Sequence, residues 1–249
     1  MALSFFLRLL LGHMVGDFIL QPYWLVLAKR NGWTGLFIHV GVVTFVTAIL
    51  LSVSSIPNWW VWVIVLYLGH LFIDQFRTFV FIDNSRGKGL LLLILDQIVH
   101  LLFIVFLAWL ATGWTFSDLR PLITTASNEQ RMIAYLTGLA ILIGVVPVLE
   151  VEIAVVILAL QGTSLNHTVK VDLSDRVLGS IERTIAAGLI LFGYGLIAPL
   201  VFLPRLAVMI YQGQAEANRT TVITKVVVSL VSAIVIGVLL RYIPLPSIF

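Results

Sequence analysis

Long apolar segments dominate this sequence and decide which folds are open to it. A stretch of about 20 apolar residues forms a helix that can cross the hydrocarbon core of a bilayer, which is about 30 Å thick. We therefore predict an all-α fold, a polytopic transmembrane helix bundle of about seven spans. The predicted spans cover roughly residues 3–21, 34–52, 59–77, 89–111, 131–161, 184–204 and 221–241.

The composition excludes several classes of protein. Of the 249 residues, 60% are hydrophobic and only 11% are charged, whereas a soluble domain has about a quarter of its residues charged. The 15 Lys and Arg residues are scattered without a basic block, which argues against nucleic acid as a partner. There is no cysteine, so any metal must be held by nitrogen and oxygen atoms. The expected partner is the lipid bilayer, and the sequence sets no oligomeric state.

Basic residues between the predicted spans indicate topology. Lys29 and Arg30 follow the first span, and Arg77, Arg86 and Lys88 accompany the turn after the third. Because cytoplasmic loops of membrane proteins are enriched in Lys and Arg, we expect both turns to be cytoplasmic. The prediction is a multi-pass protein of the bacterial inner (cytoplasmic) membrane, with the N-terminus outside.

The chain divides into two predicted regions. We expect residues 1–111 to form a four-helix membrane domain and residues 112–249 to form a C-terminal membrane region of about three spans. The segment 131–161 contains Pro147, so it forms either one kinked helix or a re-entrant pair.

Histidines and aspartates mark the first four predicted spans. One histidine lies in each span, and three of the four have an aspartate four residues away. This spacing places both side chains on one face of a helix. Ionisable groups inside a membrane are costly unless they pair, bind an ion or face water. We therefore expect one shared site near the cytoplasmic side, formed by His13, Asp17, His39, His70, Asp74, Asp96 and His100.

The residue types predict a metal centre. Imidazole and carboxylate ligands without thiolate suit a divalent ion such as zinc, manganese or iron. All seven residues of the shared site are candidate ligands, and one or two ions could be held. Asp17, Asp74 and Asp96 are the candidate catalytic bases. Gln21, Gln75 and Gln97 are interpreted as accessory residues that orient ligands or pack helices.

Three functions remain open from these residues. The first is a metal-dependent hydrolase acting on a lipid-like or amphipathic substrate whose head group lies near Arg77, Arg86 or Lys88. The second is a transporter of protons or divalent cations. The third is a non-catalytic membrane scaffold, in which the His and Asp residues form a structural hydrogen-bond network.

Charged residues also occur in the later spans. Glu150 and Glu152 indicate either a second polar centre or an interfacial position. Arg183, at the start of the sixth predicted span, is typical of a side chain that extends along the helix to the membrane interface.

The ordered set of motifs resembles a bacterial family of integral membrane proteins catalogued as a domain of unknown function. The motifs are the string HMVGDFILQ from His13 to Gln21, then Trp24, Lys29 and His39, and the segments 70–74 and 96–100. They cover about residues 5–110. The resemblance supports a polar membrane site and names no reaction. The His-x3-Asp pattern is also similar to that of small membrane-bound metal-dependent hydrolases.

A second element extends the resemblance towards the C-terminus. Longer members of that family have a Gly-x-x-Glu-Arg pattern that opens another membrane helix, and Gly179-Ser-Ile-Glu182-Arg183 looks like it. Arg205 falls where that helix would end, in place of the more usual Lys. The resemblance implies that Glu182 and Arg183 are accessory residues of the site.

Overall fold

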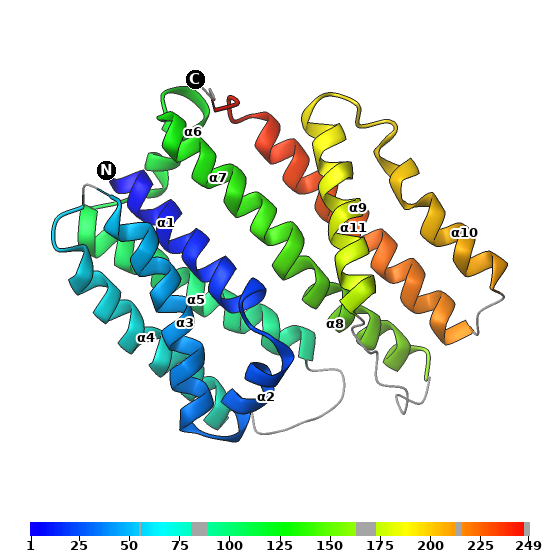
Figure 1. Ribbon diagram of the computed structural model, residues 1–249, viewed down its shortest axis with the longest axis horizontal. Helices are drawn as coiled ribbons and strands as arrows, with labels where there is room; N and C mark the ends of the chain where they lie inside the picture. Colours follow the sequence, from blue (N-terminus) through cyan, green and yellow to red (C-terminus); the bar gives the residue numbers. More distant parts are fainter. Residues whose placement is uncertain (55, 81–88, 163–172, 213–215, 247–249) are drawn as a thin grey trace. The chain divides into compact units, whose positions relative to one another are not determined.

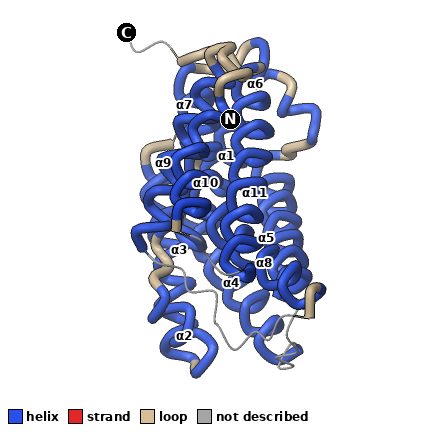
Figure 2. The backbone as a smooth tube through the Cα atoms, turned by 90° about the vertical axis from the view of Figure 1, so that its right-hand side faces the viewer, coloured by secondary structure: helices blue, strands red, loops and turns tan. Residues whose placement is uncertain are grey.

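The structure is a bundle of helices. The computed structural model describes residues 1–54, 56–80, 89–162, 173–212 and 216–246, and these residues contain no strand (Figure 2). Within them, six helices are long and apolar enough to cross a membrane, and the 19-residue α9 (Leu173–Leu191) is a further long helix. The predicted all-α bundle of about seven spans is confirmed. The six helices are Ala2–Ile19, Trp33–Ser52, Trp59–Arg77, Gly89–Thr112, Asn128–Leu160 and Asn218–Arg241.

The chain forms two compact units. Unit 1 comprises Met1–Asn84, Leu91–Ala140 and Ile243–Phe249, and unit 2 comprises Ser85–Leu90 and Ile141–Tyr242. The helices of unit 1 are labelled in Figure 1. They are α1 (Ala2–Met14), the π-helix η1 (Val15–Ile19), α2 (Tyr23–Asn31), α3 (Trp33–Ser52), α4 (Trp59–Val80), α5 (Gly89–Thr112), the 3-10 helix η2 (Phe116–Leu119), α6 (Pro121–Thr124) and α7 (Asn128–Ala140).

The first span, formed by α1 and η1, approaches α3 closely at two glycines four residues apart. A Cβ atom added at Gly12 would lie 3.0 Å from the Cα of Thr47, and one at Gly16 would lie 2.6 Å from the Cα of Val43. Small residues at this spacing let two membrane helices pack backbone to backbone. The two glycines thus fix the distance between the helices that carry His13 and His39.

Gly16→Val should therefore lower the stability of unit 1. The new side chain meets the backbone of Val43, which cannot move aside as a flexible side chain could, and overpacking of this kind costs about 1–3 kcal/mol or more. The measurement is thermal unfolding of the full chain in detergent, followed by tryptophan fluorescence. Gly41→Val on α3 is the matched control, because nothing lies within 4 Å of a Cβ added there. Equal unfolding temperatures for the two variants would contradict the prediction.

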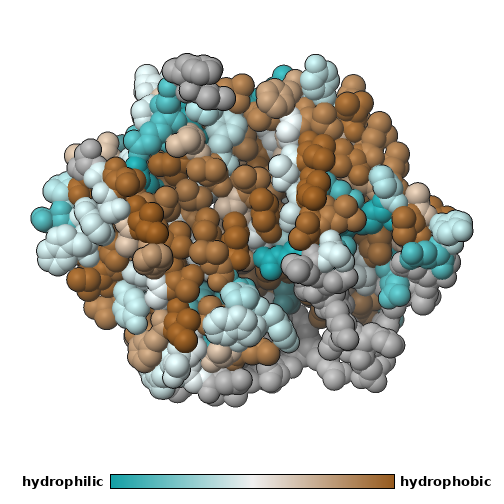
Figure 3. Space-filling model, viewed as in Figure 1, coloured by the Kyte–Doolittle hydropathy of each residue, from teal (hydrophilic) through white to brown (hydrophobic). Residues whose placement is uncertain are grey.

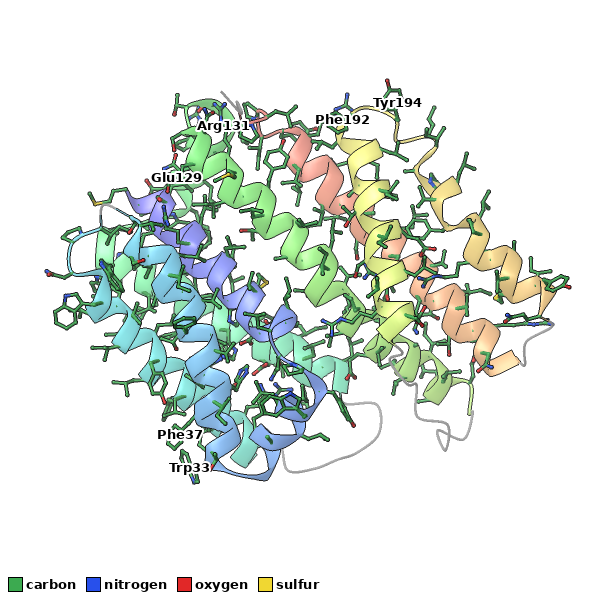
Figure 4. The ribbon with its side chains drawn as sticks, viewed as in Figure 1. Trp33, Phe37, Glu129, Arg131, Phe192 and Tyr194 are labelled. Carbon is green, nitrogen blue, oxygen red and sulfur yellow. The ribbon has the colours of Figure 1, made fainter. Side chains whose placement is uncertain are left out.

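A buried arginine ties the start of α1 to its neighbours. Arg8 is 4% exposed and donates hydrogen bonds to the Ser4 hydroxyl at 3.2 Å and to the Leu50 carbonyl. It also pairs with Glu129 at the start of α7 (Figure 4). The charge of Arg8 is thus compensated at the end of the span away from His13.

Unit 2 packs its helices around a small apolar core. The core side chains include Ala187 and Ile190 of α9 and Ala233 of α11. A Cβ at Gly237 would lie 2.8 Å from the carbonyl oxygen of Ala187, so α9 and α11 also pack closely. The elements are the π-helix η3 (Ile141–Val145), α8 (Val146–Leu160), α9, the 3-10 helix η4 (Ala198–Phe202), α10 (Leu203–Tyr211) and α11 (Glu216–Arg241).

Two predicted spans in the C-terminal half are now defined. The segment 131–161 is one helix that contains the π-helical turn η3 just before Pro147, so the re-entrant alternative is wrong. The boundaries 184–204 predicted for the sixth span are also wrong, because α9 ends at Leu191. Gly193 has a φ of +90°, and the Tyr194 amide donates to the Leu189 carbonyl at 2.7 Å, which is a glycine-terminated helix end.

The outer surface is largely apolar. In Figure 3, hydrophobic residues cover much of the visible face. On α4, the exposed side chains Leu68, Phe72 and Phe76 recur every four residues, whereas His70 and Asp74 on the same helix are buried. Trp33 and Phe37 lie exposed at the start of α3 with their ring centroids 5.7 Å apart (Figure 4), as is typical of an aromatic belt at the interface. Apolar residues outside and charged residues inside are the arrangement expected in lipid.

Candidate metal centre

Unit 1 brings all seven predicted ligand residues into one buried cluster, which we call the His/Asp cluster. Their side chains are at most 5% exposed. Four membrane-spanning segments contribute, so the cluster depends on tertiary packing and not on one motif. The residues are His13 of α1, Asp17 of η1, His39 of α3, His70 and Asp74 of α4, and Asp96 and His100 of α5.

The first part of the cluster has the spacing of metal ligands. Asp17 Oδ1 lies 3.4 Å from both His39 Nε2 and His70 Nε2. Asp74 Oδ2 lies 3.2 Å from His39 Nε2 and 3.7 Å from His70 Nε2. Ligand atoms about 2.0–2.1 Å from a tetrahedral ion are about 3.3–3.4 Å apart. These separations fit donors arranged around a shared cation.

Asp74 connects this part of the cluster to a second one. Its other oxygen, Oδ1, lies 3.7 Å from His100 Nε2. The ligand atoms of Asp74, Asp96 and His100 all lie within 4.8 Å of one another, and the same holds for His39, His70 and Asp74. A carboxylate whose two oxygens face different ligand groups can bridge two ions, so the donor set suits either one ion or two.

His100 is oriented by its own helix. Its Nδ1 donates a hydrogen bond to the Asp96 carbonyl oxygen at 2.9 Å, which leaves Nε2 directed towards Asp74. Histidine ligands of metals almost always donate their other ring N–H to a carbonyl or carboxylate in this way.

Two glutamines orient two further histidines. Gln97 Oε1 lies 3.2 Å from His13 Nε2, and His13 Nδ1 faces Asp17 Oδ1 at 3.8 Å. With its amide oxygen turned towards His39, Gln21 accepts from His39 Nδ1 at 3.2 Å and donates to the Asp17 carbonyl at 2.6 Å. Both glutamines thus contact the cluster. Gln75 is half-buried, and among the described residues it makes no hydrogen bond to the cluster.

Several buried donor atoms lack a hydrogen bond of their own. In the described part of the chain, Asp17 Oδ1, His70 Nε2 and His100 Nε2 have no hydrogen-bond partner, and neither does Asp96 Oδ1. An unsatisfied buried polar atom costs about 1–3 kcal/mol. A bound cation would satisfy buried atoms of this kind, and the nitrogen and oxygen donors of the cluster fit zinc, manganese or iron.

Two cations line the edge of the cluster. Lys29 Nζ on α2 lies 3.5 Å from Asp74 Oδ2 and 3.4 Å from His39 Nε2. Arg77 Nη1 donates to Asp96 Oδ2 at 2.8 Å. Sequence reasoning used Lys29 for topology and for the family resemblance, and did not place it at the cluster. The close contact of α2 with α3, where a Cβ at Gly35 would lie 2.2 Å from the Ala28 carbonyl carbon, places it over the cluster.

The remaining predicted site residues lie elsewhere. Glu182 and Arg183 belong to unit 2, where Glu182 pairs with Arg205 and Arg183 donates to Leu142 and Glu150. Arg86 and Lys88, expected beside a head group, fall outside the described residues.

Arg183 is the centre of a second buried network. It is 0% exposed, so the prediction that it extends to the membrane interface is wrong. It donates to the Leu142 carbonyl at 2.9 Å and to Glu150 Oε1 at 2.5 Å. The hydroxyls of Ser180 and Ser229 accept from it at 3.0 and 3.1 Å. The guanidinium is therefore compensated inside the bundle, and Glu150 belongs to a polar centre.

Further ion pairs extend this network within unit 2. Arg205 Nη2 lies 2.9 Å from Glu182 Oε2, and Arg205 Nη1 lies 3.4 Å from Asp175 Oδ1. Lys225 also pairs with Asp175. Together with Arg183 and Glu150, these residues provide three cations and three carboxylates, so the network is neutral in formal charge.

Comparison with known proteins adds a family likeness. Residues 5–128 match a family model described as "Protein of unknown function (DUF3307)", and all seven residues of the His/Asp cluster lie in the matched range. This match supports a relation to a family of unknown function. No curated protein and no solved structure matches the chain. The function must therefore be argued from the site itself.

Proposed function

We propose that this protein is a metal-dependent hydrolase of the bacterial inner membrane that acts on a lipid-like or amphipathic substrate. The observation that supports it is the convergence of imidazole and carboxylate atoms from four membrane-spanning segments at ligand separations, where atoms from three of these segments have no hydrogen bond of their own. A structural network would be expected to satisfy its own hydrogen bonds. The residues of the His/Asp cluster would hold zinc, manganese or iron.

The residues of the cluster divide the chemical tasks. A bound divalent ion would supply a water molecule of lowered pKa and polarise a carbonyl or phosphoryl oxygen. Asp17 is the best-placed general base, because its Oδ1 accepts no hydrogen bond. Asp96 Oδ1 also accepts no hydrogen bond, but Asp96 is less suited, since Arg77 and Gln97 both donate to its Oδ2. Asp74 is shared between the two ligand groups, which favours a role as a ligand.

Burial within membrane spans supports an amphipathic substrate. The aspartates and histidines lie in helices long and apolar enough to cross a bilayer. Two cations border the cluster and are more exposed than its residues: Lys29, with 14% of its side chain exposed, and Arg77, with 29%. A substrate with an apolar body in the bilayer and a polar group at these cations would reach the cluster.

Elemental analysis of the detergent-purified protein tests this proposal. We expect near-stoichiometric metal and lipid hydrolysis in the wild type. We expect both to be lost in the double variant His70→Ala/Asp74→Ala. The control is Leu68→Ala/Phe72→Ala, which removes two exposed side chains of the same helix and should retain the metal. A folded wild type that takes up neither Zn²⁺ nor Mn²⁺ on reloading would contradict the proposal.

Transport of protons or divalent cations is the second candidate. It is favoured by the second buried set of ionisable groups, Glu150, Arg183 and their partners, in unit 2. Intramembrane ionisable groups often mark ion pathways. This function predicts ion flux in proteoliposomes that Glu150→Gln reduces, whereas a hydrolase predicts turnover without flux.

A further inference from the structure

The charges around the His/Asp cluster do not balance once a metal is bound. The cluster has three carboxylates, and Lys29 and Arg77 add two positive charges at its edge. With neutral histidines, one divalent ion would leave a net charge of one positive unit, and two ions would leave three. Uncompensated charge away from water is costly. A loaded cluster therefore needs an anionic ligand.

The two cations occupy the position from which such a ligand would be contacted. The exposed fractions of their side chains, 14% for Lys29 and 29% for Arg77, exceed those of the seven ligand residues, which are at most 5%. Lys29 is held by Asp74 and Arg77 by Asp96. The two cations lie at the same part of the cluster, because Asp74 and Asp96 belong to one group of potential ligands. An anion that approaches the cluster would meet these two side chains first.

Metal binding would free both cations for a new partner. Lys29 is paired with Asp74, and Arg77 donates to Asp96. Carboxylates that bind a divalent ion give up part of their charge to it, so the pairs with Lys29 and Arg77 weaken. A guanidinium recognises phosphate oxygens through two parallel hydrogen bonds, and an ammonium adds a compact charge beside it.

We propose that Lys29 and Arg77 form an anion clamp for a phosphate group, so that the substrate class of this site is a phosphate monoester of a lipid alcohol. A phosphate monoester has up to two negative charges, which suits a centre with one to three positive charges better than an uncharged ester does. In its hydrolysis, a water oxygen bonds to phosphorus and the bond from phosphorus to the lipid oxygen breaks. One water proton passes to the released alcohol. This inference rests on the proposed function.

The test measures lipid binding and metal content on the same samples. The full chain in detergent, loaded with Mn²⁺, is titrated with phosphatidic acid, with diacylglycerol of the same acyl chains and with inorganic phosphate. Lys29→Gln and Arg77→Gln should keep the metal, yet each should weaken the binding of phosphatidic acid about tenfold or more. Arg120→Gln is the control. Arg120 is an exposed residue of unit 1 outside the cluster, and its substitution removes one positive charge, as the two test substitutions do.

The outcomes separate the clamp from the metal centre. If inorganic phosphate competes but binds more weakly than phosphatidic acid, the result would support a lipid phosphate as the ligand. If inorganic phosphate binds as tightly as phosphatidic acid, the result would assign the clamp to free phosphate. Diacylglycerol that binds as tightly as phosphatidic acid would overturn the clamp. So would unchanged lipid binding in both variants, or loss of metal from both. A wild type without metal would instead overturn the proposed function on which the clamp rests.

Discussion

Asp74→Asn should weaken metal binding more than any other single change of a carboxylate in the His/Asp cluster. Asp74 is the residue whose two oxygens face different histidines, with Oδ2 near His39 and His70 and Oδ1 near His100. Its substitution thus removes a donor from both ligand groups. Loss of a group that only supports a ligand costs about 10–100-fold in affinity, so we expect a loss of more than about a hundredfold here.

The comparison with the other carboxylates makes this prediction specific. Metal affinity is measured by competition with a chelator for Asp74→Asn, Asp17→Asn and Asp96→Asn. Asp118→Asn serves as the control, because this residue caps the helix η2 outside the cluster. An affinity of Asp74→Asn equal to that of the control, or higher than that of Asp96→Asn, would show that Asp74 does not join the two ligand groups.

The sequence pattern predicted much of the His/Asp cluster, because the spacing along each helix places three of its residue pairs. The pairs His13 with Asp17, His70 with Asp74 and Asp96 with His100 are placed by helix geometry alone. The same geometry lets His100 donate to the Asp96 carbonyl. His39 has no such partner on its own helix, and its position depends on the Gln21 amide and on the contact of η1 with α3 at Gly16. The Gly12–Gly16 spacing was a signal that could have predicted this contact.

The features that sequence reasoning missed depend on contacts between distant residues. Lys29 looks like an interfacial residue until α2 packs on α3. Arg183 and Glu150 are 33 residues apart and lie on different helices, so no periodicity connects them. The boundary of α9 depends on one glycine with positive φ, a conformation that an apolar stretch does not reveal. In each case the apolar pattern predicts that a helix exists, whereas tertiary packing decides which polar groups meet.

Arg183→Gln should destabilise unit 2 more than any other exchange of an arginine for glutamine in that unit. Arg183 is fully buried and satisfies Glu150, the hydroxyls of Ser180 and Ser229, and the Leu142 carbonyl. Glutamine is shorter and neutral, so it leaves Glu150 as a buried carboxylate without its cation. Removing one partner of a buried ion pair costs about 3–5 kcal/mol. The measurement is thermal unfolding of the full chain in detergent.

A second substitution separates the charge effect from lost packing. In Glu150→Gln/Arg183→Gln neither charge remains, so part of the lost stability should return even though two native side chains are gone. Arg219→Gln is the matched control, because Arg219 is exposed on α11 of the same unit and should unfold like the wild type. If Arg183→Gln unfolds at the temperature of this control, the buried network is not what holds α8, α9 and α11 together. If the double variant is no more stable than the single one, the cost lies in lost packing and hydrogen bonds and not in the unpaired carboxylate.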